Sequence, residues 1–196
     1  MTPEGVAPSP LDADRPAVTE AAPGVEGLTV WLTGLPSAGK TTLALCLADR
    51  LARAGRRVEV LDGDAVRRHL TKDLGYSRRD RAENVRRVGF VAHLLSRNGI
   101  VAVCALVSPY RQERDEVRAL HAGRFCEVHV SAPVEVCMAR DVKGLYARQR
   151  AGALHGVTGV DDPYEAPLRP DVVVPTHLQT VEESVATIWV AIAGLI

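Results

Sequence analysis

One short segment near the N-terminus constrains the fold more than any other part of the chain. Residues 34–41 read GLPSAGKT, which fits the pattern G-x-x-x-x-G-K-[ST] of a phosphate-binding loop. A run rich in apolar and β-branched residues precedes the loop at 28–33, and apolar residues at helical spacing follow it at 42–51. Such a loop works between a strand and a helix, so the sequence predicts a nucleoside triphosphate site. The alternative, a glycine turn that binds nothing, does not account for the full motif in this context.

The residue types in this loop explain how it would hold phosphates. Gly34 and Gly39 permit backbone conformations and a close approach that a Cβ atom would block. The loop N–H groups and the helix N-terminus then form a cradle for an anion. Lys40 is expected to reach the β- and γ-phosphates, and the Thr41 hydroxyl to bind Mg²⁺. The predicted nucleotide-binding residues of the loop are Gly34, Leu35, Pro36, Ser37, Ala38, Gly39, Lys40, Thr41 and Thr42.

Two carboxylates follow the second expected strand, residues 57–61. In an open parallel sheet, ligands bind outside the carboxyl ends of the strands, so Asp62 and Asp64 are expected beside the ligand. They could hold Mg²⁺ through water, or accept the proton of an acceptor hydroxyl. Alternatively, Asp64 is only the N-cap of a short helix at 64–70.

Strands and helices alternate along the rest of the chain. Further strands are expected at 100–107, 125–130 and 171–174, helices at 80–97, 109–121 and 181–196, and one more helix that starts after Pro133. The helix at 80–97 begins with Asp80 and Glu83 at capping-box spacing. This alternation predicts a three-layer α/β fold, in which helices flank a five-stranded parallel sheet.

Ser108 stands at the carboxyl end of the apolar run at 100–107, beside the expected site. It is either the N-cap of a helix that starts at Pro109 or a functional residue. Residues 141–165 begin as a basic segment punctuated by glycine and are predicted to form a mobile lid. Such a lid supplies cations to a phosphoryl group and excludes water. The alternative is an ordinary solvated helix and loop.

Charge is unevenly distributed in a chain whose formal net charge is zero. Residues 1–26 sum to −4 and are predicted to be a disordered tail, so the remainder sums to +4. Arginines crowd between Asp62 and Arg97, which suggests a small anionic ligand, although any one of them could lie on a solvated helix face. The overall charge gives no reason to expect binding to nucleic acid or to a membrane.

The four cysteines lack metal-site or redox spacing and each stands among apolar residues: Cys46, Cys104, Cys126 and Cys137. They are predicted to be buried free thiols in a reducing, cytoplasmic compartment. There is no apolar run of membrane-spanning length and no secretory signal pattern at the N-terminus.

Taken together, these motifs resemble adenylylsulfate kinase (APS kinase), the P-loop kinase family of sulfate assimilation. The matching segments are GLPSAGKTT at 34–42, DGDAVRRHL at 62–70, LGYSRRDRAENVRRVG at 74–89, VSPYRQERDEVR at 107–118, EVHVSAPVEVCMARDVKGLYARQRAG at 127–152 and TGVDDPYEAPLRPD at 158–171. The likeness runs from about residue 27 to the end. The loop at 34–42 is generic, whereas the ordered combination is highly specific.

The resemblance implies ATP-dependent, Mg²⁺-assisted phosphorylation of the 3′-hydroxyl of adenosine 5′-phosphosulfate (APS), commonly by a homodimer. It adds Arg140 to the nucleotide site and implies catalytic roles for Lys40, Asp62, Asp64 and Ser108, with Thr41 and Asp62 at the metal. The implied APS-binding residues are Asp64, Arg67, Tyr76, Arg81, Asn84, Val107, Ser108, Lys143 and Val157. The family's phosphoserine intermediate matches Ser108, but direct in-line transfer is physically simpler, because phosphoryl transfer needs positioning and charge neutralisation rather than a covalent step.

Two positions depart from the family pattern. The family usually has an aromatic residue before the Thr-Gly pair at 158–159, where it stacks on the substrate adenine opposite the residue that matches Tyr76. Val157 stands there instead, which is expected to weaken adenine binding by about 1 kcal/mol. Ala65 replaces the asparagine of the family's DGDN segment, so one side-chain amide is missing.

Other functions stay open from the sequence. One is a P-loop kinase for a different small alcohol, which the two departures favour. Another is a nucleotide-binding regulator without turnover. The residues whose retention argues against it are Lys40, Thr41, Asp62, Asp64 and Ser108. A switch GTPase is less favoured, because no N-K-x-D guanine motif is present.

Overall fold

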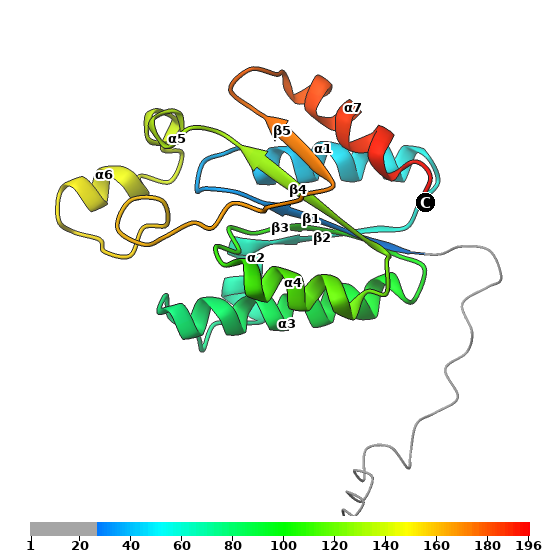
Figure 1. The fold of residues 1–196 in the computed structure, drawn as a ribbon, viewed down its shortest axis with the longest axis horizontal. Helices are drawn as coiled ribbons and strands as arrows, with labels where there is room; N and C mark the ends of the chain where they lie inside the picture. Colours follow the sequence, from blue (N-terminus) through cyan, green and yellow to red (C-terminus); the bar gives the residue numbers. More distant parts are fainter. Residues whose placement is uncertain (1–26) are drawn as a thin grey trace, which may run out of the picture.

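The computed structural model describes residues 27–196 and shows a parallel sheet between two layers of helices (Figure 1). The predicted tail, residues 1–26, lies outside the described residues. The five strands lie in the order β2-β3-β1-β4-β5, and each pair of neighbours is parallel. The strands are β1 (Leu28–Thr33), β2 (Val58–Asp62), β3 (Val101–Ala105), β4 (Phe125–Ser131) and β5 (Val172–Pro175). The predicted α/β fold with a five-stranded parallel sheet is confirmed.

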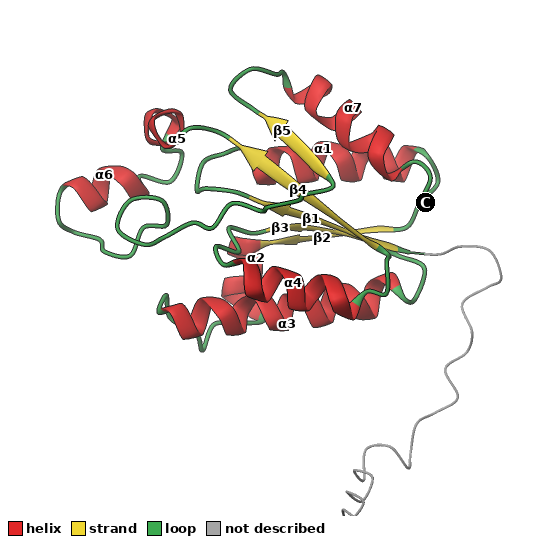
Figure 2. Ribbon diagram, viewed as in Figure 1, coloured by secondary structure: helices red, strands yellow, loops and turns green. Residues whose placement is uncertain are grey.

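Helices cover both faces of this sheet, and two further short helices lie beyond its carboxyl end (Figure 2). The helices are α1 (Lys40–Arg53), α2 (Gly63–His69), α3 (Arg78–Ser96), α4 (Arg111–Leu120), α5 (Val134–Arg140), α6 (Leu145–Arg150) and α7 (Val181–Ile192). Figure 1 shows α1 and α7 against one face, and α3 and α4 against the other. Among the described residues, no helix is both long and apolar enough to cross a membrane.

Alternation along each strand builds a separate core on each face. On β1, Leu28, Val30 and Leu32 point to the α1 side, whereas Trp31 points to the α3 side; all four are fully buried. A strand covered on both faces is apolar at consecutive positions, which is the pattern seen here and in β3. The core therefore fixes β1 in the middle of the sheet and places the loop that follows it at the carboxyl edge.

Two predicted helix starts are wrong. Helix α3 begins earlier than expected: Ser77 is its N-cap and accepts a hydrogen bond from the Asp80 N–H group, so Asp80 lies inside the first turn. Helix α2 is capped by Asp62 rather than by Asp64, because the Asp62 carboxylate accepts from the backbone of Asp64 and Ala65. In both places several capping residues stand close together, and the backbone angles decide which of them caps.

Two other expectations are also corrected. Ser108 does not cap a helix, and Pro109 does not begin one: α4 starts at Arg111, after Tyr110 as its cap position. Ser108 instead has a positive φ of 38°, so the chain turns sharply before the helix. Cys46 is exposed on α1, whereas the other three cysteines are buried as predicted.

Candidate active site

The phosphate loop lies between the end of β1 and the start of α1, as predicted. Gly39 is the N-cap of α1, with φ 103°, a conformation that favours glycine. A Cβ atom at Gly34 would lie 2.4 Å from the carbonyl oxygen of Val130 on the adjacent strand. Both glycines are therefore required by this geometry, one by its backbone angle and one by close packing.

Lys40 is folded back onto this loop. Its ammonium donates hydrogen bonds to the carbonyl oxygens of Gly34, at 2.9 Å, and Leu35, at 2.7 Å. The side chain is buried, and burial lowers the pKa of Lys40 to about 7. The two carbonyl oxygens stand in for the acceptors that a phosphate would provide, so the ammonium is already directed into the loop.

Thr41 and Asp62 form the second part of the nucleotide side. The Thr41 hydroxyl donates to Asp62 Oδ2 at 2.8 Å, while Oδ1 of the same carboxylate caps α2. Hydroxyl and carboxylate oxygens are suitable Mg²⁺ ligands, and Mg²⁺ at kinase sites typically uses few protein ligands together with substrate phosphates. Within residues 27–196, no group of three or more His, Cys, Asp or Glu side chains could hold a metal ion. The residues present thus fit a Mg²⁺ that completes its shell with phosphate and water.

Arg140 connects the end of α5 to the phosphate loop. Its guanidinium donates to the carbonyl oxygen of Thr176 at 2.7 Å and to the hydroxyl of that residue at 3.2 Å. The Thr176 hydroxyl in turn donates to the carbonyl oxygen of Ala38 at 2.7 Å. Arg140 is therefore placed beside the phosphate loop, where the sequence resemblance put it.

An exposed aromatic ring with two guanidinium groups close to it forms a second cluster of candidate residues. Tyr76 is 67% exposed, and the guanidinium carbons of Arg67 and Arg81 lie 4.8 Å and 5.6 Å from its ring centroid. Asn84 is buried nearby on α3, where its side-chain oxygen accepts from the Thr71 hydroxyl at 2.7 Å. An exposed ring close to two cations is suited to a base together with anionic groups.

Residues 156–166, here called the return loop, pack against this arginine cluster and against the phosphate loop. Arg81 donates to the carbonyl oxygen of Gly156 at 2.5 Å and to the hydroxyl of Thr158 at 3.0 Å. Gly159, with φ 91°, packs on the phosphate loop so closely that a Cβ atom there would lie 2.5 Å from a methyl carbon of Leu35. The return loop therefore contacts both halves of the site.

A lysine of the segment predicted to be the lid pairs with a carboxylate of α2. Lys143, just before α6, forms an ion pair with Asp64 at the start of α2, and both side chains are about half exposed. Asp64 is thus free of the capping role and directed toward the segment predicted to be the lid. Val157, by contrast, is buried, packed against the apolar core on the α1 side.

The hydroxyl of Ser108 is enclosed. It accepts a hydrogen bond from Trp31 Nε1 at 3.1 Å and donates one to Thr33 Oγ1 at 2.9 Å. The Thr33 hydroxyl also lies 3.1 Å from the hydroxyl of Tyr164. Ser108 is 3% exposed, so its side chain is part of a buried polar network rather than an open surface.

Sequence reasoning missed three residues of this region: Arg114, Glu127 and Tyr164. Arg114 lies on the buried face of α4, at helical spacing from the buried Val117, where an apolar residue would be usual. A charge at a core position of an amphipathic helix is the signal that could have found it. Glu127 gave a similar signal, since it stands in the apolar run of β4.

This fold and site define a P-loop kinase. The site has a phosphate loop with its lysine, a hydroxyl–carboxylate pair suited to Mg²⁺, a second carboxylate, and a cluster of arginines suited to a second, anionic substrate. Similarity in fold alone extends to a gluconokinase of Sinorhizobium meliloti, with a TM-score of 0.58 at 18% identity.

Comparison with known proteins gives the family. The family model of adenylylsulphate kinase matches residues 26–175, and the chain belongs to this family. It is 56% identical over 164 residues to the adenylyl-sulfate kinase of Rippkaea orientalis, covering 84% of this chain and 90% of that protein. The corresponding enzyme of Picosynechococcus is 57% identical over 159 residues, covering 81% and 89%.

A solved relative carries both expected ligands. The APS kinase of Mycobacterium tuberculosis, in complex with AMPPNP and APS, has a TM-score of 0.83 and 38% identity to this chain. The match covers 87% of this chain and 99% of that one. A hexameric APS kinase from Thiobacillus denitrificans is also similar, with a TM-score of 0.67 at 38% identity; the match covers 29% of that chain.

Proposed function

We propose that this protein transfers the γ-phosphoryl group of ATP to the 3′-hydroxyl of APS, giving 3′-phosphoadenosine 5′-phosphosulfate and ADP. One observation carries the proposal: the two carboxylates at the start of α2 have different partners, and the same helix carries Arg67. Asp62 contacts Thr41 of the phosphate loop, and Asp64 contacts Lys143 of the segment predicted to be the lid. A carboxylate between a phosphate loop and an anion-binding cluster is where the hydroxyl of an acceptor is needed.

In this mechanism the phosphates of ATP replace the carbonyl oxygens that now accept from Lys40. Thr41 and Asp62 would hold Mg²⁺, which neutralises charge on the β- and γ-phosphates when it is bound. Asp64 orients the acceptor hydroxyl and takes up its proton. Lys143, released from that carboxylate, supplies a cation near the transferred group.

Arg67, Arg81 and Tyr76 select the acceptor. Two guanidinium groups match the sulfate and phosphate of APS, and the exposed ring offers a stacking face for adenine. Residues 141–165 act as the lid, and their closure excludes water, which would otherwise accept the phosphoryl group.

Transfer is direct rather than through a phosphorylated Ser108. The hydroxyl of Ser108 already uses both its donor and an acceptor position inside the molecule. Its phosphorylation would require the Trp31 and Thr33 contacts to break and a dianion to enter a buried site, which is costly. The enclosed hydroxyl therefore supports the in-line route.

A second acceptor, another small alcohol of related shape, is favoured by Val157 and Ala65, which remove an aromatic ring and an amide expected in the family. Two further expectations remain predictions on the same footing: a homodimer and a cytoplasmic location.

The test is ATP consumption by the purified protein with Mg²⁺ and APS, with the product identified by mass. Lys40→Ala serves as the control without phosphate-binding cation. The 3′-phosphorylated sulfonucleotide is the expected product, and AMP, which lacks the sulfate, should compete poorly as an acceptor. ATP binding without turnover would favour the regulator, and preference for AMP would favour the second acceptor.

A further inference from the structure

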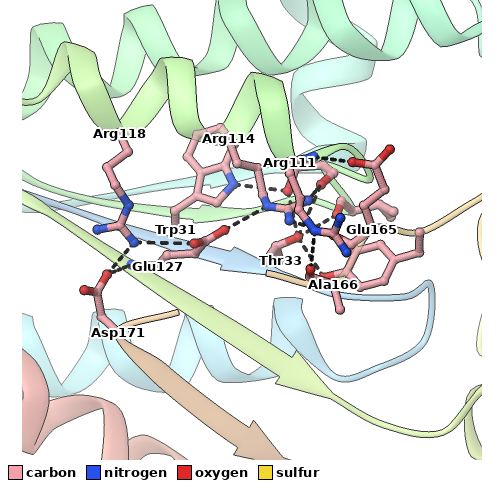
Figure 3. Close-up of polar contacts among 12 residues, drawn as sticks. Trp31, Thr33, Arg111, Arg114, Arg118, Glu127, Glu165, Ala166 and Asp171 are labelled. Carbon is pink, nitrogen blue, oxygen red and sulfur yellow. Dashed lines mark hydrogen bonds and ion pairs between the residues drawn. The ribbon is translucent and has the colours of Figure 1, made fainter. Parts of the chain in front are cut away.

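Arg114 is a buried cation that the mechanism above does not use. It projects from α4 toward the carboxyl edge of the sheet and is 2% exposed (Figure 3). Each of its three guanidinium nitrogens donates to a different segment: Nε to Glu127 Oε1 at 2.8 Å, Nη1 to the carbonyl oxygen of Ser108 at 2.6 Å, and Nη2 to the carbonyl oxygen of Glu165 at 2.7 Å. One planar group thus joins β4, the loop after β3 and the return loop.

The charge of Arg114 is balanced locally. Glu127 on β4 is 5% exposed, and its second oxygen accepts from Arg118 at 3.4 Å. Arg118 also donates to Asp171 at 2.7 Å, and that carboxylate accepts from the backbone N–H group of Glu127 at 2.7 Å. A buried charge is tolerated only when it is paired and hydrogen-bonded, and this alternating row of charges meets the requirement.

The two carbonyl groups that Arg114 holds belong to segments that shape the acceptor side. Ser108 has a positive φ of 38°, which is an unfavourable angle for serine, so its backbone needs contacts that keep it there. Glu165 stands at the end of the return loop. Its N–H group donates to the carbonyl oxygen of Pro109 at 2.8 Å, and its carboxylate accepts from the N–H group of Arg111 at 2.9 Å.

The return loop carries this restraint to the substrate side. Upstream of Glu165, it contacts Arg81 through Gly156 and Thr158, and it packs on Leu35 of the phosphate loop through Gly159. The position of the acceptor-binding arginine therefore depends on a loop whose base is fixed by the Arg114 guanidinium.

We propose that Arg114 is a positioning residue for the acceptor substrate: its three-way hydrogen bonding sets the Ser108 backbone and the base of the return loop in the conformation that binds APS. The inference rests on the proposed function. Lysine cannot replace this arginine, because a single ammonium lacks the planar fork that reaches three acceptors in fixed directions.

The test compares Arg114→Lys with Arg118→Lys. Both variants keep the charge of the row, but Arg118 contacts Glu127 and Asp171, not the Ser108 or Glu165 backbone. Arg114→Lys is expected to raise the KM for APS by about tenfold or more, because misplaced binding groups weaken substrate positioning, while the KM for ATP stays within about twofold. Arg118→Lys is expected to leave both constants within about twofold.

Equal changes in both KM values, or an unchanged KM for APS in Arg114→Lys, would overturn the proposal. If the unmutated enzyme does not phosphorylate APS, the proposed function fails instead, so the two failures are distinguishable.

Should Arg114→Lys not fold, an NMR measurement on the wild-type enzyme labelled with ¹⁵N-arginine tests the proposal. Its Nε–H signal, identified by the shift that Glu127→Gln causes, should move on addition of APS and less on addition of AMPPNP. A signal that APS does not move overturns the proposal.

Discussion

The free enzyme should take up a proton at Lys40 when it binds nucleotide. Burial lowers the pKa of this ammonium to about 7, and its present partners are two uncharged carbonyl groups. Phosphate oxygens carry negative charge, so bound nucleotide favours the charged form and raises the pKa again. Between these two pKa values, binding and protonation are coupled.

The number of protons taken up on nucleotide binding follows from the lowered pKa of Lys40. At about pH 8.5, a group with a pKa near 7 is roughly 3% protonated, so nearly one proton enters for each nucleotide bound. By the same linkage, affinity should fall by about tenfold for each pH unit above 7, until the pKa of the bound form is reached. The same lowered pKa affects the stability of the enzyme without nucleotide. In the unfolded chain this lysine has its ordinary pKa of 10.5, so between about pH 7 and 10.5 the unfolded chain binds more protons than the folded one. The contribution of Lys40 to the free energy of unfolding therefore rises with pH over this range.

Titration calorimetry with ATP and Mg²⁺ in two buffers of different ionisation enthalpy counts the protons. Lys40→Arg is the matched control, because it keeps the charge and its guanidinium stays protonated throughout. The difference between the two proteins removes the titration of the nucleotide itself. An uptake below about 0.3 proton at about pH 8.5 would show that Lys40 is already charged in the free enzyme, which refutes the argument from burial.

Three further results are expected. Ser108→Ala should keep transfer within about tenfold of the wild type in a turnover assay, because the enclosed hydroxyl contributes hydrogen bonds rather than chemistry; complete loss with intact ligand binding would restore the covalent route. Val157→Phe should lower the KM for APS, because it restores the aromatic ring that the family has at this position. It should also reduce the free energy of unfolding by about 1–3 kcal/mol, since the position is already packed. An unchanged or higher KM would show that this side chain does not line the adenine site. Gly159→Ala should reduce kcat/KM by about tenfold by displacing Leu35, and a second change, Leu35→Ala, should recover part of the loss; no recovery would place the defect in the backbone angle alone.

The sheet and the phosphate loop could be predicted from sequence because they are encoded locally. Most residues of each strand are apolar, and each strand is followed by a helix, so the order of elements and the edge that carries the site follow from parallel topology. The limits of elements were less predictable. Ser77 and Asp80 are both good capping residues, and only the backbone angles show that Ser77 caps while Asp80 lies in the first turn.

The support for the site could not be predicted because its contacts are distant in sequence. Arg114 and Glu165 lie 51 positions apart, and nothing near either residue shows that they meet. On α4, helical spacing can mark Arg114 as a charge at a core position, but it does not identify the residues that pair with it. The prediction for Cys46 was wrong in the opposite sense. Its neighbours in the sequence are apolar, which suggested burial, but its own position on α1 faces solvent.

The positions of the four thiols allow local opening of the native structure to be followed by the rate at which each cysteine is modified. Cys46 is accessible in the native state, whereas Cys104 and Cys126 lie in the sheet and Cys137 lies in α5, beside the segment predicted to be the lid. A thiol reagent modifies a buried cysteine only while its surroundings are open. Movements confined to the lid would therefore expose Cys137 alone, and global unfolding would expose all three buried thiols together, with no label added to the chain.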